Sequence, residues 1–180
     1  MTFSWSIAEG KYSYCINNPL SSAYYNLKRF QKHTNINGMA RIEMNRTTGD
    51  FGFEVKDEMG HILSTDSSKE NGGSGSGFRP MQLVLCALGS CSAIDMVSIL
   101  KKQRQEIKDL SIIIEGEREK DKIPSLWKSI SVTFQLTGNV EKEKADKAAS
   151  LSMEKYCSVA ETLRRGGTDI SWIVRVSPSM

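Results

Sequence analysis

Hydrophobic and polar positions alternate in three short runs between residues 41 and 66. The runs 41–45 (RIEMN), 50–57 (DFGFEVKD) and 61–66 (HILSTD) are extended segments, and turn residues at 48–50 (TGD) and 59–60 (MG) separate them. This pattern predicts a β-meander. The next segment, 66–78 (DSSKENGGSGSGF), is rich in Gly and Ser, and we expect it to be a flexible polar loop.

The pattern then changes to a long helix over residues 80–104. Pro80 suits the first position of a helix, and the basic residues 101, 102 and 104 suit its C-terminal end. Because its apolar positions wrap around more than one face, we expect this helix to be buried on most sides. Polar residues interrupt the segment, so no apolar run reaches the ~20 residues that span a bilayer.

Two strands, a second helix and a final strand follow. Residues 110–119 and 127–138 read as strands, and the second alternates clearly. The pattern predicts one helix over 139–165, with Asn139 as N-cap and glycines at 166–167 as its stop, and a last strand over 170–177. The order predicts an α+β fold in which two large helices pack on antiparallel sheet.

Length and charge divide the chain at about residue 38. The 180 residues suit one domain at 39–180 and an N-terminal extension at 1–38, which holds the whole net charge of +3. The segment 1–38 is either a partly ordered extension or an artefact ahead of a natural start at Met39, and we favour the second. The balanced charge of the rest predicts no nucleic-acid partner. The N-terminus does not read as a secretory signal, so we expect a cytoplasmic protein with reduced thiols and no membrane partner.

The cysteines are the candidate chemical groups. Cys86 and Cys91 lie about 140° apart around a helix axis and do not share a face. With only two histidines in the chain, we expect no metal site and no cofactor. Cys157 lies on or next to the apolar stripe of the second helix. Two buried helices with one cysteine each could bring two thiols together, or both could simply be packed side chains.

Two segments resemble the OsmC/Ohr family, in particular its YhfA-like branch. They are 80–107 (PMQLVLCALGSCSAIDMVSILKKQRQEI) and 151–159 (LSMEKYCSV), within a resemblance that covers about 39–177. The resemblance implies an intertwined homodimer with sheets wrapped around two long central helices and two active sites at the dimer interface. It also implies that Cys91 attacks a hydroperoxide and that Cys157 resolves the product as a disulfide, which an external thiol or dithiol reduces. Cys86 is expected in the core, and Cys15 receives no role.

The same resemblance implies an arginine that stabilises the Cys91 thiolate and a carboxylate that holds this arginine. Arg46, in the turn after the first strand, is the best-placed candidate and Arg41 is the second. Gln82 stands where the YhfA-like branch commonly has the carboxylate, and an amide cannot form an ion pair. Asp95, one turn after Cys91, would disfavour a thiolate if it were unpaired.

Two functions therefore remain open from the sequence. The favoured one is a thiol-dependent hydroperoxide reductase acting on organic hydroperoxides through Cys91 and Cys157, in oxidative-stress defence. The alternative is a non-catalytic dimer of the same fold that senses redox state or binds a small molecule. Gln82 is the residue that favours the alternative.

Overall fold

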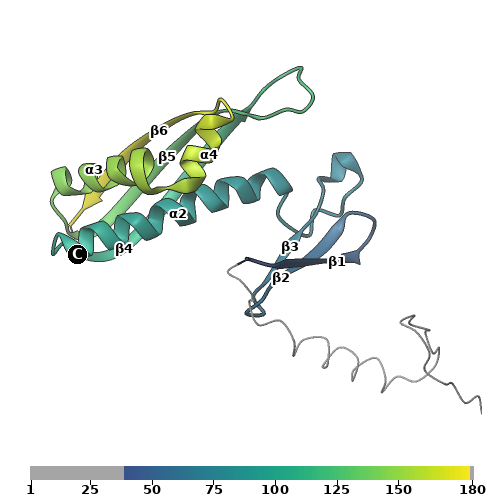
Figure 1. Ribbon diagram of the computed structural model, residues 1–180, viewed down its shortest axis with the longest axis horizontal. Coiled ribbons are helices and arrows are strands. Elements are labelled where there is room, and N and C mark those ends of the chain that lie inside the picture. The colour runs from purple at the N-terminus through teal and green to yellow at the C-terminus, as the bar shows by residue number, and fades with distance from the viewer. Residues whose placement is uncertain (1–38, 179–180) are drawn as a thin grey trace, which may run out of the picture. The chain divides into compact units, whose positions relative to one another are not determined.

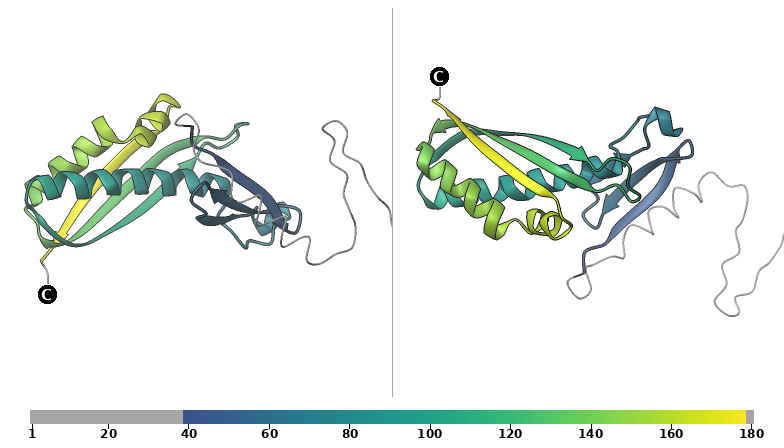
Figure 2. Two further views of the ribbon diagram at one scale, coloured as in Figure 1. Left: turned by 60° about the horizontal axis from the view of Figure 1, so that its bottom comes forward. Right: turned by 90° about the horizontal axis from the view of Figure 1, so that it is seen from above.

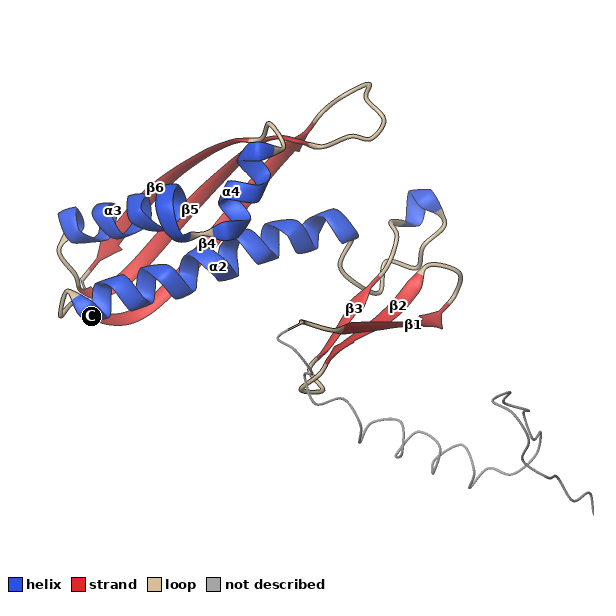
Figure 3. Ribbon diagram, viewed as in Figure 1, coloured by secondary structure: helices blue, strands red, loops and turns tan. Residues whose placement is uncertain are grey.

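The structure is a computed structural model that describes residues 39–178 (Figure 1). The predictions for residues 1–38, including the choice between an extension and a start at Met39, lie outside the described residues, as does Cys15. The described chain forms two three-stranded sheets and a layer of helices (Figure 3).

The first sheet is the predicted meander. It contains β1 (Ile42–Thr48), β2 (Gly52–Asp57) and β3 (Ile62–Thr65) in the order β1-β2-β3. The turns form at Gly49 and Gly60, whose φ angles of 55° and 86° favour glycine. Because the first turn begins only at Gly49, β1 is longer than predicted, and Arg46 lies within the strand and not in the turn after it.

The loop 66–78 is organised around a buried carboxylate, which differs from the flexible loop predicted from its composition. Asp66 is 2% exposed. It accepts hydrogen bonds from the backbone and hydroxyl of Ser74 (3.0 and 2.6 Å), from those of Ser76 (both 3.1 Å) and from the Ser67 backbone (2.7 Å). These hydrogen bonds, that from the Ser74 hydroxyl first, hold the pKa of Asp66 well below its usual range. The backbone of Phe78 pairs with the end of β3 and closes the loop.

The second sheet lies under the helical layer. It contains β4 (Glu106–Arg118), β5 (Trp127–Asn139) and β6 (Asp169–Ser177) in the order β4-β5-β6. β4 and β5 pair antiparallel, as predicted, whereas β6 runs parallel to β5. The parallel pair is possible because the connection from β5 to β6 is a long helical crossover. Figure 2 shows α2 (Pro80–Lys102) and α3 (Lys142–Leu151) on the same face of this sheet.

The second predicted helix is broken, so the prediction of one helix over 139–165 is wrong. It consists of α3, a π-helical segment η2 (Ser152–Tyr156) and α4 (Ser158–Arg165). Asn139 ends β5, and Glu141 occupies the N-cap position of α3. The break falls at Cys157, whose ψ of 101° is extended. A π segment inside a helix is rare and is often found at functional sites.

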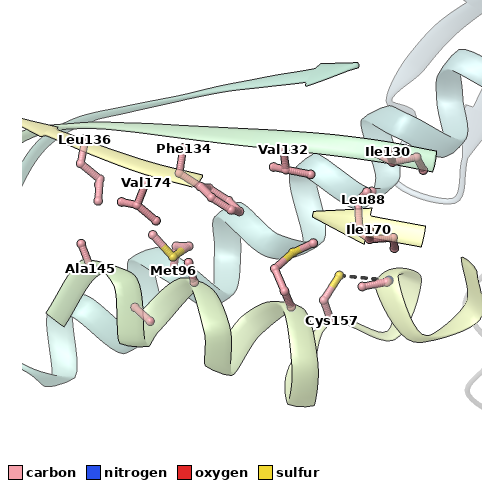
Figure 4. Packing of buried hydrophobic residues seen from close by; sticks show 14 of the residues in the cluster. Leu88, Met96, Ile130, Val132, Phe134, Leu136, Ala145, Cys157, Ile170 and Val174 are labelled. Atoms are coloured by element: carbon pink, nitrogen blue, oxygen red, sulfur yellow. Dashed lines mark hydrogen bonds between the residues drawn. The ribbon is translucent and has the colours of Figure 1, made fainter. Parts of the chain in front are cut away.

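The core lies between the helices and the second sheet (Figure 4). Leu88, Met96 and Leu100 of α2 are fully buried, as is Phe134 of β5. Each such side chain stabilises the fold by roughly 1.5–3 kcal/mol. The alanines of α3 that face the core allow its backbone to approach closely; they are Ala145, Ala148 and Ala149.

The opposite face of α2 is open in the single chain, so the prediction of burial on most sides is not met. Ile94 is 68% exposed, and Cys86, which we expected in the core, is exposed. The sheet covers one side of α2, and these residues point away from that side. In contrast with the sequence expectation, α2 is long and apolar enough to cross a membrane by length and composition. In this structure its buried residues pack in the core.

Candidate active site

The structure brings Cys91 and Cys157 together. Cys91 lies half-buried on α2, and Cys157 lies at the break before α4 and is 3% exposed. They lie near enough for the Cys91 side chain to raise the pKa of the Cys157 thiol. Both residues pack in the same apolar cluster, and Figure 4 shows the Cys157 side chain pointing from the helical layer toward the sheet.

Cys157 is also the N-cap residue of α4. Its sulfur accepts a hydrogen bond from the backbone N–H of Ala160, with an S···N distance of 3.4 Å. Burial raises the pKa of the Cys157 thiol, the backbone N–H of Ala160 opposes this effect, and the Cys91 side chain adds to it, so that the net pKa is about 11. At neutral pH Cys157 is therefore a protonated thiol.

The π segment decides which residue of the broken helix faces the core. In a continuous α-helix, Tyr156 would lie about 20° and Cys157 about 120° around the axis from the buried Ala145, at ~100° per residue. Tyr156 would then point inward and Cys157 sideways. One extra residue in the turn rotates the following chain back by about 100°. As a result Tyr156 is 51% exposed, and Cys157 is buried.

Asp95 is paired, in contrast with the unpaired carboxylate that the sequence left open. Its Oδ2 accepts a hydrogen bond from the hydroxyl of Ser152, at an O···O distance of 3.0 Å. Ser152 is fully buried and begins the π segment. The contact links α2, one turn after Cys91, to the segment that ends at Cys157. Sequence patterns gave no signal for it, because the two residues lie 57 positions apart.

Gln82 caps the helix that carries Cys91. Its Oε1 accepts a hydrogen bond from the backbone N–H of Arg79 at 3.0 Å, and its own N–H donates to the Arg79 carbonyl at 2.8 Å. This is the role of the N3 residue in a capping box. Gln82 also borders an open pocket of about 310 Å³, together with Ser64 and residues 75–78. Within residues 39–178, no arginine side chain donates a hydrogen bond to Gln82.

The two candidate arginines lie on or next to β1. Arg41 forms an ion pair with Glu43, with an N···O distance of 2.6 Å. Arg46 is exposed, and no hydrogen bond or ion pair joins it to another residue that the structure describes.

Arg164 is a further residue that the sequence did not identify. Its guanidinium donates a hydrogen bond to the carbonyl of Met153 and lies over the Trp172 ring, 6.0 Å from the ring centroid. The Met153 carbonyl lies within the π segment, so this interaction depends on the break in the helix. In the described part of the chain, no group of three or more His, Cys, Asp or Glu side chains is arranged to hold a metal ion.

Comparisons with known proteins bear on the same region. The family model described as OsmC-like protein matches residues 73–172. Protein YhfA of Escherichia coli K12 is 46% identical over 87 residues, which is 48% of this chain and 64% of that protein, so the match spans less than two thirds of the relative.

Solved structures extend the similarity to most of the chain. A hypothetical protein from Aquifex aeolicus VF5 is similar with a TM-score of 0.65 and 32% identity, over 77% of this chain and 98% of that one. A Legionella pneumophila structure described as an organic hydroperoxide resistance protein OsmC has a TM-score of 0.61 and 17% identity, over 78% of this chain and 99% of that one. At that identity the second likeness supports the fold alone.

Proposed function

The chain belongs to the OsmC family, and from this premise we propose that it is a thiol-dependent hydroperoxide reductase in which Cys91 attacks the peroxide and Cys157 resolves the product. The observation that carries the proposal is the placement of the two cysteines in one apolar cluster, where Cys91 influences the pKa of Cys157; Cys91 is half-buried on α2 and Cys157 is buried at the helix break. The Legionella pneumophila structure named for organic hydroperoxide resistance has the same fold and adds support of a general kind.

The different burial of the two sulfurs supports their separate roles. The nucleophile must be a thiolate that a peroxide can reach, and Cys91 is the more accessible of the pair. Cys157 is buried, and its raised pKa keeps its proton at neutral pH. Cys91 itself contributes to raising that pKa.

The proposed reaction has three balanced steps. The Cys91 thiolate attacks the distal oxygen of ROOH, the O–O bond breaks, and with one proton the products are ROH and Cys91 sulfenic acid. Cys157 then attacks the Cys91 sulfur, so an S–S bond forms and water leaves. Finally an external dithiol reduces the disulfide by exchange and becomes a disulfide itself. Apolar neighbours of the two sulfurs favour an organic peroxide, since its alkyl group would be buried with them.

The remaining assignments belong to the same proposal. The open face of α2 suits a second copy of the chain, as expected for a homodimer. We also propose a cytoplasmic location, with no nucleic-acid or membrane partner. Arg46 is proposed as the cation for Cys91. Gln82 is proposed to act by capping α2, since its oxygen is occupied by the helix N-terminus.

The second candidate function is a non-catalytic dimer that uses the cysteine pair to sense redox state or that binds a small molecule. The observation that favours it is the capping role of Gln82, which leaves the site without the carboxylate expected to hold an activating arginine.

Thiol-dependent consumption of cumene hydroperoxide decides between the two functions. We expect Cys91→Ser to abolish consumption and Cys157→Ser to prevent the intramolecular disulfide. Cys86→Ser is the matched control, because that thiol is exposed on the same helix. Equal rates for wild type and Cys91→Ser would rule out the reductase. Mass spectrometry after one equivalent of peroxide should find a Cys91–Cys157 linkage, and its absence would remove the resolving role.

A further inference from the structure

We propose that Asp95 and Ser152 are positioning residues that hold Cys157 against Cys91. They contact each other and not the proposed substrate, so their effect acts through the cysteine pair. The inference deepens the proposed function and rests on it for its purpose, although the geometry itself can be tested without any peroxide.

The first link is the hydrogen bond between α2 and the π segment. The Ser152 hydroxyl is fully buried and donates to Oδ2 of Asp95 at 3.0 Å. Asp95 lies four residues after Cys91, hence on the same side of α2. A hydrogen bond to a charged group is stronger than one between neutral groups, so this contact ties Ser152 firmly to the helix that carries the nucleophile.

The second link is in the backbone. In an α-helix the N–H of Cys157 would donate to the carbonyl of Met153, four residues before it. Here it donates to the carbonyl of Ser152 at 2.8 Å, five residues before it. The residue that Asp95 anchors through its side chain therefore anchors Cys157 through its carbonyl. Two consecutive hydrogen bonds thus run from α2 to the backbone of the resolving cysteine.

The third link compensates for the change in register. The Met153 carbonyl has lost its α-helical donor, and a buried carbonyl without a partner is costly. Arg164 of α4 donates to this carbonyl. Both carbonyls affected by the change in hydrogen-bond register therefore have donors: Cys157 N–H for Ser152 and Arg164 for Met153. Since the extra residue in the turn is what directs Cys157 inward, the side chains that stabilise this turn set the distance between the two sulfurs.

The test is the thiol–disulfide equilibrium of the Cys91–Cys157 pair with glutathione, in the full chain carrying Cys15→Ser and Cys86→Ser. Glutathione disulfide takes two electrons from the two thiols, which form an S–S bond while two glutathione thiols are released. We expect Ser152→Ala to lower the equilibrium constant for disulfide formation by about tenfold, the size expected for one hydrogen bond to a charged group. Asp95→Ala should do the same, and combining the two should add little, because both remove one contact.

Two variants serve as matched controls. Asp95→Asn keeps an acceptor oxygen for the Ser152 hydroxyl. Its equilibrium constant for disulfide formation should stay within about threefold of that of the chain carrying only Cys15→Ser and Cys86→Ser. Ser158→Ala makes the same chemical change at an exposed position next to Cys157 and should have no effect. If Ser152→Ala does not fold, Asp95→Ala and Asp95→Asn test the positioning role by themselves: a loss in Asp95→Ala alone supports it, and equal equilibrium constants reject it.

Unchanged equilibria in Ser152→Ala and Asp95→Ala, or an equal loss in Ser158→Ala, would overturn the positioning role. A tenfold loss in a protein that does not consume peroxide would support positioning and reject the reductase. If the wild type consumes peroxide and neither substitution changes the equilibrium, the result supports the reductase and rejects the positioning role.

Discussion

The buried proton of Cys157 should make the stability of the fold depend on pH in the alkaline range. The pKa of this thiol is raised from its ordinary value of 9.0 to about 11, first because the thiol is buried. A group whose pKa is raised in the folded state contributes stability below the unfolded pKa and loses it as pH rises through the folded pKa. The contribution is therefore complete below about pH 9 and falls between about pH 9 and 11.

The magnitude follows from the size of the shift. Two pKa units correspond to about 3 kcal/mol in total, and about 2 kcal/mol of this is lost by pH 11, where half of the folded molecules have an ionised Cys157. Solvent screening is small, because the side chain is only 3% exposed.

Urea unfolding of the reduced protein followed by circular dichroism measures this loss. From about pH 8 to 11, the free energy of unfolding of the wild type should fall by about 2 kcal/mol more than that of Cys157→Ala. The cavity left by the substitution lowers stability at every pH and cancels in the comparison. Cys86→Ala, which removes an exposed thiol, should follow the wild type. If the free energies of unfolding of the wild type and Cys157→Ala differ by the same amount at both pH values, burial does not raise the pKa of Cys157.

Three further substitutions test separate parts of the structure. Cys91→Ala should lower the pKa of Cys157 below its value of about 11, because Cys91 raises it. Thiolate ultraviolet absorbance against pH measures this pKa, and an unchanged or higher value would show that Cys91 does not act on Cys157. Gln82→Glu should keep the helix cap and raise Tm by about 1–3 °C at neutral pH through the helix dipole, and calorimetry showing a lower Tm would contradict the capping role. Gly73→Ala should open the loop 66–78 to limited proteolysis, because a Cβ would lie 2.2 Å from the Ser67 carbonyl oxygen, and unchanged cleavage would disprove that close packing.

The elements that local patterns specify were predictable from the sequence. The strands and α2 follow from periodicity, from glycines in turns and from Pro80 at the helix start, and the structure confirms the α+β fold. The motifs around Cys91 and Cys157 indicated the family, which the comparisons confirm. In each case the information lies within one segment or in the spacing of a motif.

The features that the sequence did not reveal depend on contacts between distant residues. The predicted continuous helix fails at Cys157 because a π segment is stabilised by Asp95 on another helix and by Arg164 further along the chain. The loop 66–78 looked flexible because its composition does not show that Asp66 collects hydrogen bonds from serines eight and ten residues away. Gly and Ser residues suit a flexible linker and a tightly hydrogen-bonded loop equally well.

The break in the helix also bears on the choice between the two candidate functions. A relative that only binds a small molecule needs the fold but has no requirement for a particular orientation of Cys157, whereas a reductase or a redox sensor needs the two thiols to pair. A continuous α-helix would satisfy every backbone group in this segment without help, whereas the observed π turn needs Arg164 to supply a donor to the Met153 carbonyl. The turn exposes the large apolar surface of Tyr156 and buries a thiol in its place, which gives less apolar burial. This exchange does not favour stability, but it does bring Cys157 to Cys91, and we infer that the pairing of the two thiols is what the local structure serves.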